Sequence, residues 1–203
     1  MTTDTARDQK HQRAMAKQKS AVDAGIAAAT EERGVAVLLT GDGKGKTSSA
    51  FGMVLRALGY GQQVAVIQFI KGVQLSGEEM YLRDQCPQVH FYQMGTGFTW
   101  DTQDRQADIA AAQTTWEVAQ KALQDESIDL VVLDEITYML AFDYLPEAEV
   151  LAAIQERPNQ QSVVVTGRGG GAALRDIMDT VSEVKEIKHA YRAGVSARRG
   201  VDY

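Results

Sequence analysis

The amino-acid sequence predicts an α/β fold built on an open, doubly wound, mainly parallel sheet. Short continuous runs of Val, Ile and Leu alternate along the chain with longer helix-forming stretches. Strands that are apolar on both faces are typical of a parallel sheet covered by helices on both sides. The chain has 203 residues, of which 44% are hydrophobic and 24% charged. A chain of this size and composition buries a core without metal or disulfide staples.

The expected elements follow one another from residue 35 onward. Strands are predicted at the apolar runs, and helices in the longer stretches between them. Ser76 is expected to cap a helix with Glu78 and Glu79 in its first turn, where the helix dipole favours acids. The predicted strands are 35–40, 64–69, 89–94, 128–134, 162–166 and 181–187, and the predicted helices are 46–58, one opening at Ser76, and 103–124.

The first 34 residues differ from the rest and are predicted to form a separate arm before one main domain at 35–203. They are polar, with five bases between Arg7 and Lys19 against one acid, Asp8. Their apolar residues form at most one weak helical stripe. One interpretation is a frayed helical extension, and the other is an arm that orders over a ligand or a partner subunit. The stripe consists of Ala14, Met15, Ala21, Val22 and Ile26.

Charge and cysteine content narrow the possible functions. Lys and Arg number 21 and Asp and Glu 27, for a net charge of −6. This balance argues against broad nucleic-acid or membrane-surface binding, though it allows a local basic pocket. The single cysteine, Cys86, excludes an internal disulfide and is expected to be a buried structural thiol. No apolar run approaches the ~18 residues of a membrane span and no signal peptide is visible, so a cytoplasmic protein is predicted.

The first apolar run leads directly into a glycine-rich loop, residues 40–48 (TGDGKGKTS). Glycines let backbone N–H groups turn toward phosphate oxygens, and the helix expected from Lys46 adds its positive dipole end. The motif G-x-x-x-x-G-K-[ST] is matched with its first glycine one place late, yet a strand before and a helix after favour phosphate binding over a plain turn. The residues expected to bind ATP are Gly41, Asp42, Gly43, Lys44, Gly45, Lys46, Thr47 and Ser48.

A second strand ends in two acids. Residues 128–133 are mostly apolar, and Asp134 and Glu135 follow them. An acid at a strand end is by itself more often a cap or loop residue, but beside a P-loop it indicates metal binding, because carboxyl ends of parallel strands meet at one edge. We expect Mg²⁺ or Mn²⁺ to be held by Thr47, Glu135 and Asp134, the last either directly or as a supporting residue.

Two large aromatic residues, Phe98 and Trp100, stand on a glycine-flanked loop after the third expected strand. They either cap the core or form a flat apolar platform for a large planar ligand. The P-loop motifs alone also fit an ordinary ATPase or kinase. In such an enzyme Glu135 would orient water and Arg168 would contact the γ-phosphate.

Several longer segments together resemble the P-loop family of corrinoid adenosyltransferases. These segments are TGDGKGKTSSAFG, QFIKG, GFTWDTQ, VVLDEITYMLAFDYLP, VVVTGRG and KHAYRAGVSARRGVDY, and they run in order to Tyr203. The late glycine of the loop is the family's own form. The resemblance covers about four-fifths of the chain; the arm and residues 168–175 are matched least.

The resemblance implies a cytoplasmic homodimer with a RecA-like sheet, which binds ATP in reverse polarity. Cobalt in the +1 state attacks C5′ and inorganic triphosphate leaves, in cobalamin biosynthesis or salvage. Lys46 would stabilise the leaving group, while Phe98 and Trp100 would hold the corrin with its lower ligand removed. A flavoprotein is the implied reductant. The histidines His11, His90 and His189 are expected to be structural rather than cobalt ligands.

Two other functions remain open on the residues alone. One is a small RecA-like ATPase or kinase that cleaves ATP between its β- and γ-phosphates, and the other is a non-enzymatic nucleotide-binding module. The reaction product separates the enzymes, because an adenosyltransferase releases triphosphate whereas an ATPase or kinase leaves ADP. The aromatic loop argues against the non-enzymatic module.

Overall fold

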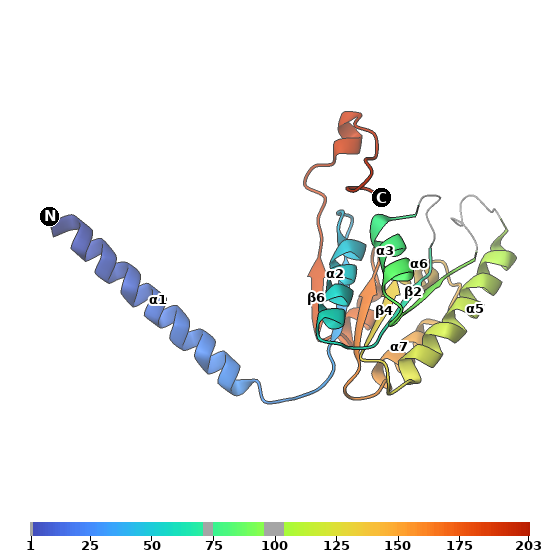
Figure 1. Ribbon diagram of the computed structural model, residues 1–203, viewed down its shortest axis with the longest axis horizontal. Coiled ribbons are helices and arrows are strands. Elements are labelled where there is room, and N and C mark those ends of the chain that lie inside the picture. Colours follow the sequence, from blue (N-terminus) through green and yellow to red (C-terminus); the bar gives the residue numbers. More distant parts are fainter. Residues whose placement is uncertain (1, 71–74, 96–103) are drawn as a thin grey trace. The chain divides into compact units, whose positions relative to one another are not determined.

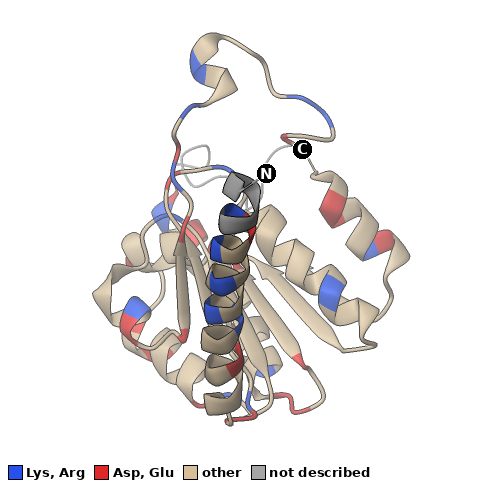
Figure 2. Ribbon diagram, turned by 90° about the vertical axis from the view of Figure 1, so that its left-hand side faces the viewer, with Lys and Arg blue, Asp and Glu red and all other residues tan. Residues whose placement is uncertain are grey.

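The structure of the protein is a computed structural model that describes residues 2–70, 75–95 and 104–203 (Figure 1). The chain divides into two compact units, Met1–Glu32 and Arg33–Tyr203. The first contains helix α1 (Thr2–Ala28). Its side chains from residue 7 onward are all exposed, and bases are spread along its length (Figure 2). Across the described ranges, no helix is both long and apolar enough to cross a membrane.

The second unit is organised around one six-stranded sheet with the order β3-β2-β4-β5-β1-β6. Every neighbouring pair in it is parallel, which confirms the predicted fold class. Strand β5 lies between β1 and β4, so the strand before the phosphate loop does not touch the strand that ends in Asp134. The strands are β1 (Ala36–Thr40), β2 (Val64–Gln68), β3 (Val89–Gln93), β4 (Leu130–Asp134), β5 (Ser162–Thr166) and β6 (Thr180–Glu183).

Helices cover both faces of the sheet (Figure 1). Because side chains alternate along a strand, each buried strand supplies both cores. In β2, Val64 and Val66 pack with Phe51, whereas Ala65 and Ile67 pack in the other core. Helices α2 (Lys46–Gly59) and α3 (Gly77–Gln85) close one face, and α5 (Arg105–Gln124), α6 (Thr137–Ala141), α7 (Glu147–Gln155) and α8 (Gly171–Asp176) close the other.

The helix starts follow local chemistry. Ser76 caps α3, as predicted, because its hydroxyl oxygen accepts from the backbone N–H of Glu79. Helix α5 begins at Arg105 rather than at residue 103, and the Asp104 carboxylate caps it. Cys86 is buried, as expected. The helices α6, α7 and α8 and the 3₁₀ turn η1 (Ala190–Ala193) were not predicted from the sequence.

The last predicted strand, 181–187, is wrong in its bounds. Strand β6 ends at Glu183, and all its residues are exposed. Among the described strands it pairs with β1 alone, and the final pair joins Thr40 to Glu183. Since β1 gives way to the phosphate loop after Thr40, residues 184–187 have no strand to pair with, although Val184 N–H still donates to Thr40 O (2.8 Å).

An ion pair between Arg33 and Asp179 stabilises the beginning of the second unit. Asp179 accepts from Arg33 Nη2 at 2.6 Å, from Arg33 Nη1 at 2.9 Å and from Ala36 N–H at 2.8 Å. These bonds, the Arg33 bond foremost, lower the pKa of Asp179 to about 2. The pair thereby joins the chain before β1 to the residue that precedes β6.

We expect Asp179→Asn to lower the free energy of unfolding by about 1 kcal/mol at pH 7. The expected loss is small because Arg33 is partly exposed and solvent screens its charge. Because the folded pKa lies below the ordinary value of 3.8, the stabilisation is present above about pH 4 and is lost as the pH falls toward 2. Denaturant unfolding of both proteins between pH 2 and 7 measures this. Asp84→Asn, which removes an exposed acid, is the control and should shift stability by less than about 0.5 kcal/mol; a pH-independent Asp179→Asn difference would contradict the assignment.

Candidate active site

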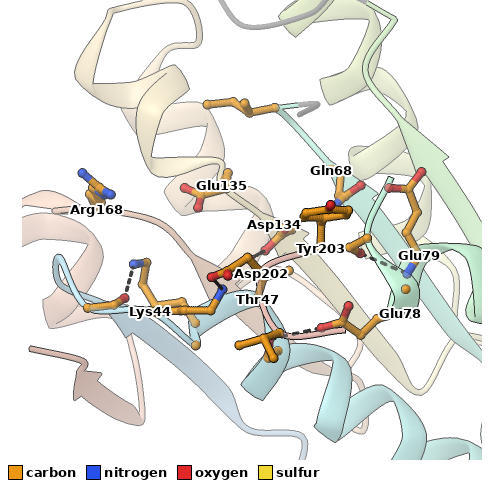
Figure 3. Close-up of a pocket in the computed structure, with 18 of the residues that line it drawn as sticks. Lys44, Thr47, Gln68, Glu78, Glu79, Asp134, Glu135, Arg168, Asp202 and Tyr203 are labelled. Atoms are coloured by element: carbon orange, nitrogen blue, oxygen red, sulfur yellow. Dashed lines mark hydrogen bonds and ion pairs between the residues drawn. The ribbon is translucent and has the colours of Figure 1, made fainter. Parts of the chain in front are cut away.

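The carboxyl ends of the central strands open into a pocket of about 800 Å³ (Figure 3). This volume lies within the range of small-molecule and cofactor sites. The phosphate loop lines the pocket together with Asp134 and Glu135, which stand at the end of β4. Arg168, from the loop after β5, and residues 200–203 also line it.

Close backbone contacts explain the glycines of the phosphate loop. Gly43 N–H donates to Val184 O at 2.7 Å, so the chain after β6 lies directly over the loop. A Cβ at Gly43 would stand 2.7 Å from the Lys185 carbonyl carbon, and one at Gly41 would stand 2.4 Å from Val184 O. Neither distance is possible for a real side chain, so both positions require glycine for space.

Thr40 accounts for the displaced glycine of the motif. It occupies the place where the usual motif has its first glycine, and its hydroxyl donates to Gly169 O at 2.6 Å. This bond ties the phosphate loop to the loop after β5, which carries Arg168. A glycine at residue 40 would lack the hydroxyl that makes this connection.

Both lysines of the loop interact with oxygen atoms of the protein itself. Lys46 is 7% exposed, and its Nζ donates to Gly43 O at 2.9 Å. Burial lowers the pKa of Lys46, while the nearby Glu135 carboxylate opposes this. The Lys44 Nζ pairs with Asp202 Oδ1 at 3.1 Å. The loop therefore presents its cations to the pocket through bonds that an incoming anion can replace.

Asp134 joins four elements. Its Oδ1 accepts from Thr47 Oγ1 at 3.0 Å and from Thr166 Oγ1 at 2.6 Å, and its Oδ2 accepts from Gln68 Nε2 at 3.0 Å. Burial raises the pKa of Asp134, and these three bonds oppose that rise. Since Thr47 gives its one hydroxyl hydrogen to Asp134, its oxygen keeps lone pairs to offer a cation.

Residues 32–203 match the family model described as ATP:corrinoid adenosyltransferase BtuR/CobO/CobP. The chain belongs to the ATP:corrinoid adenosyltransferase family. It is 49% identical to the corrinoid adenosyltransferase of Escherichia coli K12, over 97% of this chain and 99% of that one. The same identity and coverages hold for corrinoid adenosyltransferase CobA of Salmonella typhimurium LT2. The Pseudomonas aeruginosa corrinoid adenosyltransferase is also 49% identical, over the full length of both chains.

In this member of the adenosyltransferase family, Glu135 is the residue whose environment best fits a cation. Its backbone has a φ of 60°, uncommon for a residue with a side chain, and its N–H donates to Thr166 Oγ1 at 3.0 Å. Its Oε2 is buried and receives no hydrogen bond from any residue that the structure describes. Burial, followed by the neighbouring Asp134, raises the pKa of Glu135 to about 7. A buried carboxylate oxygen without a donor is suited to a metal ligand.

Within the described ranges, no group of three or more His, Cys, Asp and Glu side chains is arranged to hold a metal ion by itself. Thr47 and Glu135 therefore fit a site in which the remaining ligands come from phosphate oxygens and water, the usual situation for Mg²⁺. Asp134, whose two oxygens are already occupied by three donors, fits the supporting position better than a direct one.

The structure brings most of the predicted residues into this one pocket. Phe98 and Trp100 lie outside the described residues. Gln68, which hydrogen-bonds Asp134, was not predicted to take part in the site, although it begins the QFIKG segment. His189 lines the pocket, and its Nδ1 accepts from Tyr191 N–H at 3.2 Å to cap η1. The predicted residues that line the pocket are Asp42, Gly43, Lys44, Gly45, Lys46, Thr47, Ser48, Asp134, Glu135 and Arg168.

We expect Gly43→Ala to weaken ATP binding at least about tenfold and to destabilise the fold by about 1–3 kcal/mol, because the new methyl group would displace backbone at residues 184–185. Calorimetric titration with ATP and thermal unfolding measure the two effects. Gly52→Ala is the matched control, because a Cβ there meets nothing within 4 Å. Gly52 lies inside α2, where alanine is the better helix former, so stability should hold or rise. Unchanged ATP affinity in Gly43→Ala would show that the covered loop does not form the phosphate site.

Proposed function

We propose that this protein transfers the 5′-deoxyadenosyl group of ATP to the reduced, +1 cobalt of a corrinoid, in cobalamin biosynthesis or salvage. The observation that supports this function best is the phosphate loop, which lines a pocket of about 800 Å³. The chain that contains it is 49% identical, over nearly its whole length, to proteins named corrinoid adenosyltransferases. The electron pair of the cobalt forms the bond to C5′. The C5′–O5′ bond breaks, and its electron pair leaves with inorganic triphosphate.

In this reaction the nucleophile belongs to the substrate, so the protein needs no nucleophilic side chain and no general base. Its task is to orient C5′ and to stabilise the charge that develops on the leaving triphosphate. Lys46, Lys44 and the N–H groups of the phosphate loop are proposed for that stabilisation. Arg168 lies in the same pocket and is a further cation for the phosphates.

We propose Mg²⁺ or Mn²⁺ as the metal, held by Thr47 Oγ1 and Glu135 Oε2, with Asp134 orienting Thr47. The ion would neutralise part of the triphosphate charge. The charge of the pocket supports the proposal of a divalent cation, because the described residues that line it include seven acids but only three Lys or Arg. Metal-free ATP would meet net repulsion there. The acids are Asp42, Glu78, Glu79, Asp134, Glu135, Glu186 and Asp202, and the bases are Lys44, Lys46 and Arg168.

The corrin would be held by Phe98 and Trp100 with its lower axial ligand removed, which makes cobalt(II) easier to reduce. The position of the preceding strand supports this, since Gln93 at the end of β3 lines the pocket and Met94 N–H donates to Gln68 O at 2.9 Å. The described chain thus reaches the pocket at Gln93, a few residues before both aromatics in the sequence. We further propose a cytoplasmic homodimer, a flavoprotein reductant, and closure of the arm (residues 1–34) over the ligands.

The test of the proposed function is incubation with ATP, Mg²⁺ and chemically reduced corrinoid, with optical detection of the adenosylated product. Inorganic triphosphate should form in equal amount. Lys46→Ala should reduce the rate by roughly 10²–10³-fold, as does loss of one preorganised donor at a developing charge. Lys121→Ala, an exposed position on α5, is the control and should retain the wild-type rate. ADP as the nucleotide product would instead establish the ATPase or kinase alternative.

Replacing Phe98 or Trp100 by alanine separates corrin binding from core packing. We expect near wild-type melting temperature and ATP affinity, a collapse of adenosylation from cobalt(II) corrinoid with a mild reductant, and largely retained activity on chemically prepared cobalt(I) corrinoid. A core-capping role would instead cost about 3–5 kcal/mol of stability. Equal losses in the two activity assays would refute the redox role.

A further inference from the structure

The segment Arg198–Tyr203 folds into a turn that presents one carboxylate to the phosphate loop. Asp202 Oδ1 lies 3.1 Å from Lys44 Nζ, and Asp202 Oδ2 accepts from Arg198 N–H at 2.8 Å. Gly200 N–H donates to Tyr203 O at 2.7 Å, which closes the turn. Figure 3 shows Asp202 and Lys44 meeting inside the pocket, with Tyr203 beside them.

This carboxylate occupies a place suited to a phosphate oxygen. Residues 200–203 line the same pocket as the phosphate loop. The Arg198 N–H, followed by Lys44, lowers the pKa of Asp202, so the carboxylate is charged. A carboxylate oxygen and a phosphate oxygen make the same kind of charge-assisted bond to an ammonium group. Asp202 therefore holds Lys44 as a bound anion would.

The two loop lysines differ in what an incoming anion must displace. Lys46 gives up only the neutral carbonyl of Gly43, whereas Lys44 must leave a charged partner. ATP brings several negative charges to a pocket in which acids already outnumber bases. Asp202 and a phosphate on Lys44 would then repel one another at short range. Binding of both at once is disfavoured, so they compete.

We propose that Asp202 is a tethered competitor of the substrate's phosphates. It holds Lys44 in the empty pocket, yields Lys44 to the triphosphate of ATP, and takes it back when inorganic triphosphate leaves. Because it is part of the chain, it acts at a high effective concentration, in the millimolar range for a short tether. This inference rests on the proposed function, and it gives the reaction a means to release a polyanionic product that the phosphate loop would otherwise retain.

The test measures the Kd of inorganic triphosphate with Mg²⁺ by calorimetry at low salt. Asp202→Asn should bind triphosphate roughly three- to tenfold more tightly than wild type, since the competing charge is gone. Asp202→Glu keeps the charge and should restore the wild-type Kd. Glu117→Gln removes an exposed charge from α5, outside the pocket lining, and should leave the Kd unchanged. Melting temperatures of all variants show whether they fold.

A Lys44→Met background decides whether the competition acts through Lys44. In this background, Asp202→Asn should no longer tighten triphosphate binding. If the Asn variant still bound triphosphate more tightly, the cause would be the removal of one negative charge from the pocket rather than the release of Lys44, and the proposal would be overturned. Unchanged or weaker triphosphate binding by Asp202→Asn in the wild-type background would overturn it as well, the latter by making Asp202 a residue that positions Lys44 for phosphate. These results leave the proposed function intact. Failure of wild type to bind either triphosphate or ATP would overturn both.

Discussion

The hydrogen bonds received by the Asp134 carboxylate hold the site together. Three donors from the start of α2, the end of β2 and the end of β5 converge on one buried side chain at the end of β4. A buried charge without partners would be costly, and here each oxygen is satisfied. The same bonds fix the phosphate loop to the sheet, and they leave the lone pairs of the Thr47 oxygen available to a cation. The Thr166 hydroxyl that donates to Asp134 also accepts from Glu135 N–H, which places the second acid.

The insertion of β5 between β1 and β4 makes this arrangement possible. With one strand between them, β1 and β4 lie about two strand spacings apart, roughly 10 Å at 4.8 Å per spacing. Thr166 on the intervening strand reaches Asp134, and Thr47 reaches across from α2. The loop is held from its other side by Val184 O and by the Thr40–Gly169 bond. These contacts preorganise the loop, which matters because an electrostatic contribution to catalysis depends on donors that need not reorganise during the reaction.

The charge of the pocket suits a reaction whose leaving group is the most charged species. A strongly basic pocket would bind ATP well but would also retain triphosphate after the C5′–O5′ bond breaks. Here the described lining has more acids than bases, so affinity for the polyanion rests on the few lysines of the loop and, in the mechanism proposed above, on a divalent cation. Uniformly tight binding of substrate and product would not raise the rate, which favours such a balance.

The sequence by itself determined the local and periodic features. Continuous apolar runs established the parallel, doubly wound sheet, and the motifs placed Lys46, Thr47, Asp134 and Glu135 at strand ends that share one edge. The longer segments established the family. Only the tertiary structure decided the strand order, the donors Gln68 and Thr166, the extent of β6, and the return of residues 198–203 to Lys44. The physical reason is that periodicity records which face of an element is buried, whereas these contacts join residues far apart in the chain, such as Thr47 and Asp134 at a separation of 87. Their formation depends on how whole elements pack, which no local pattern specifies.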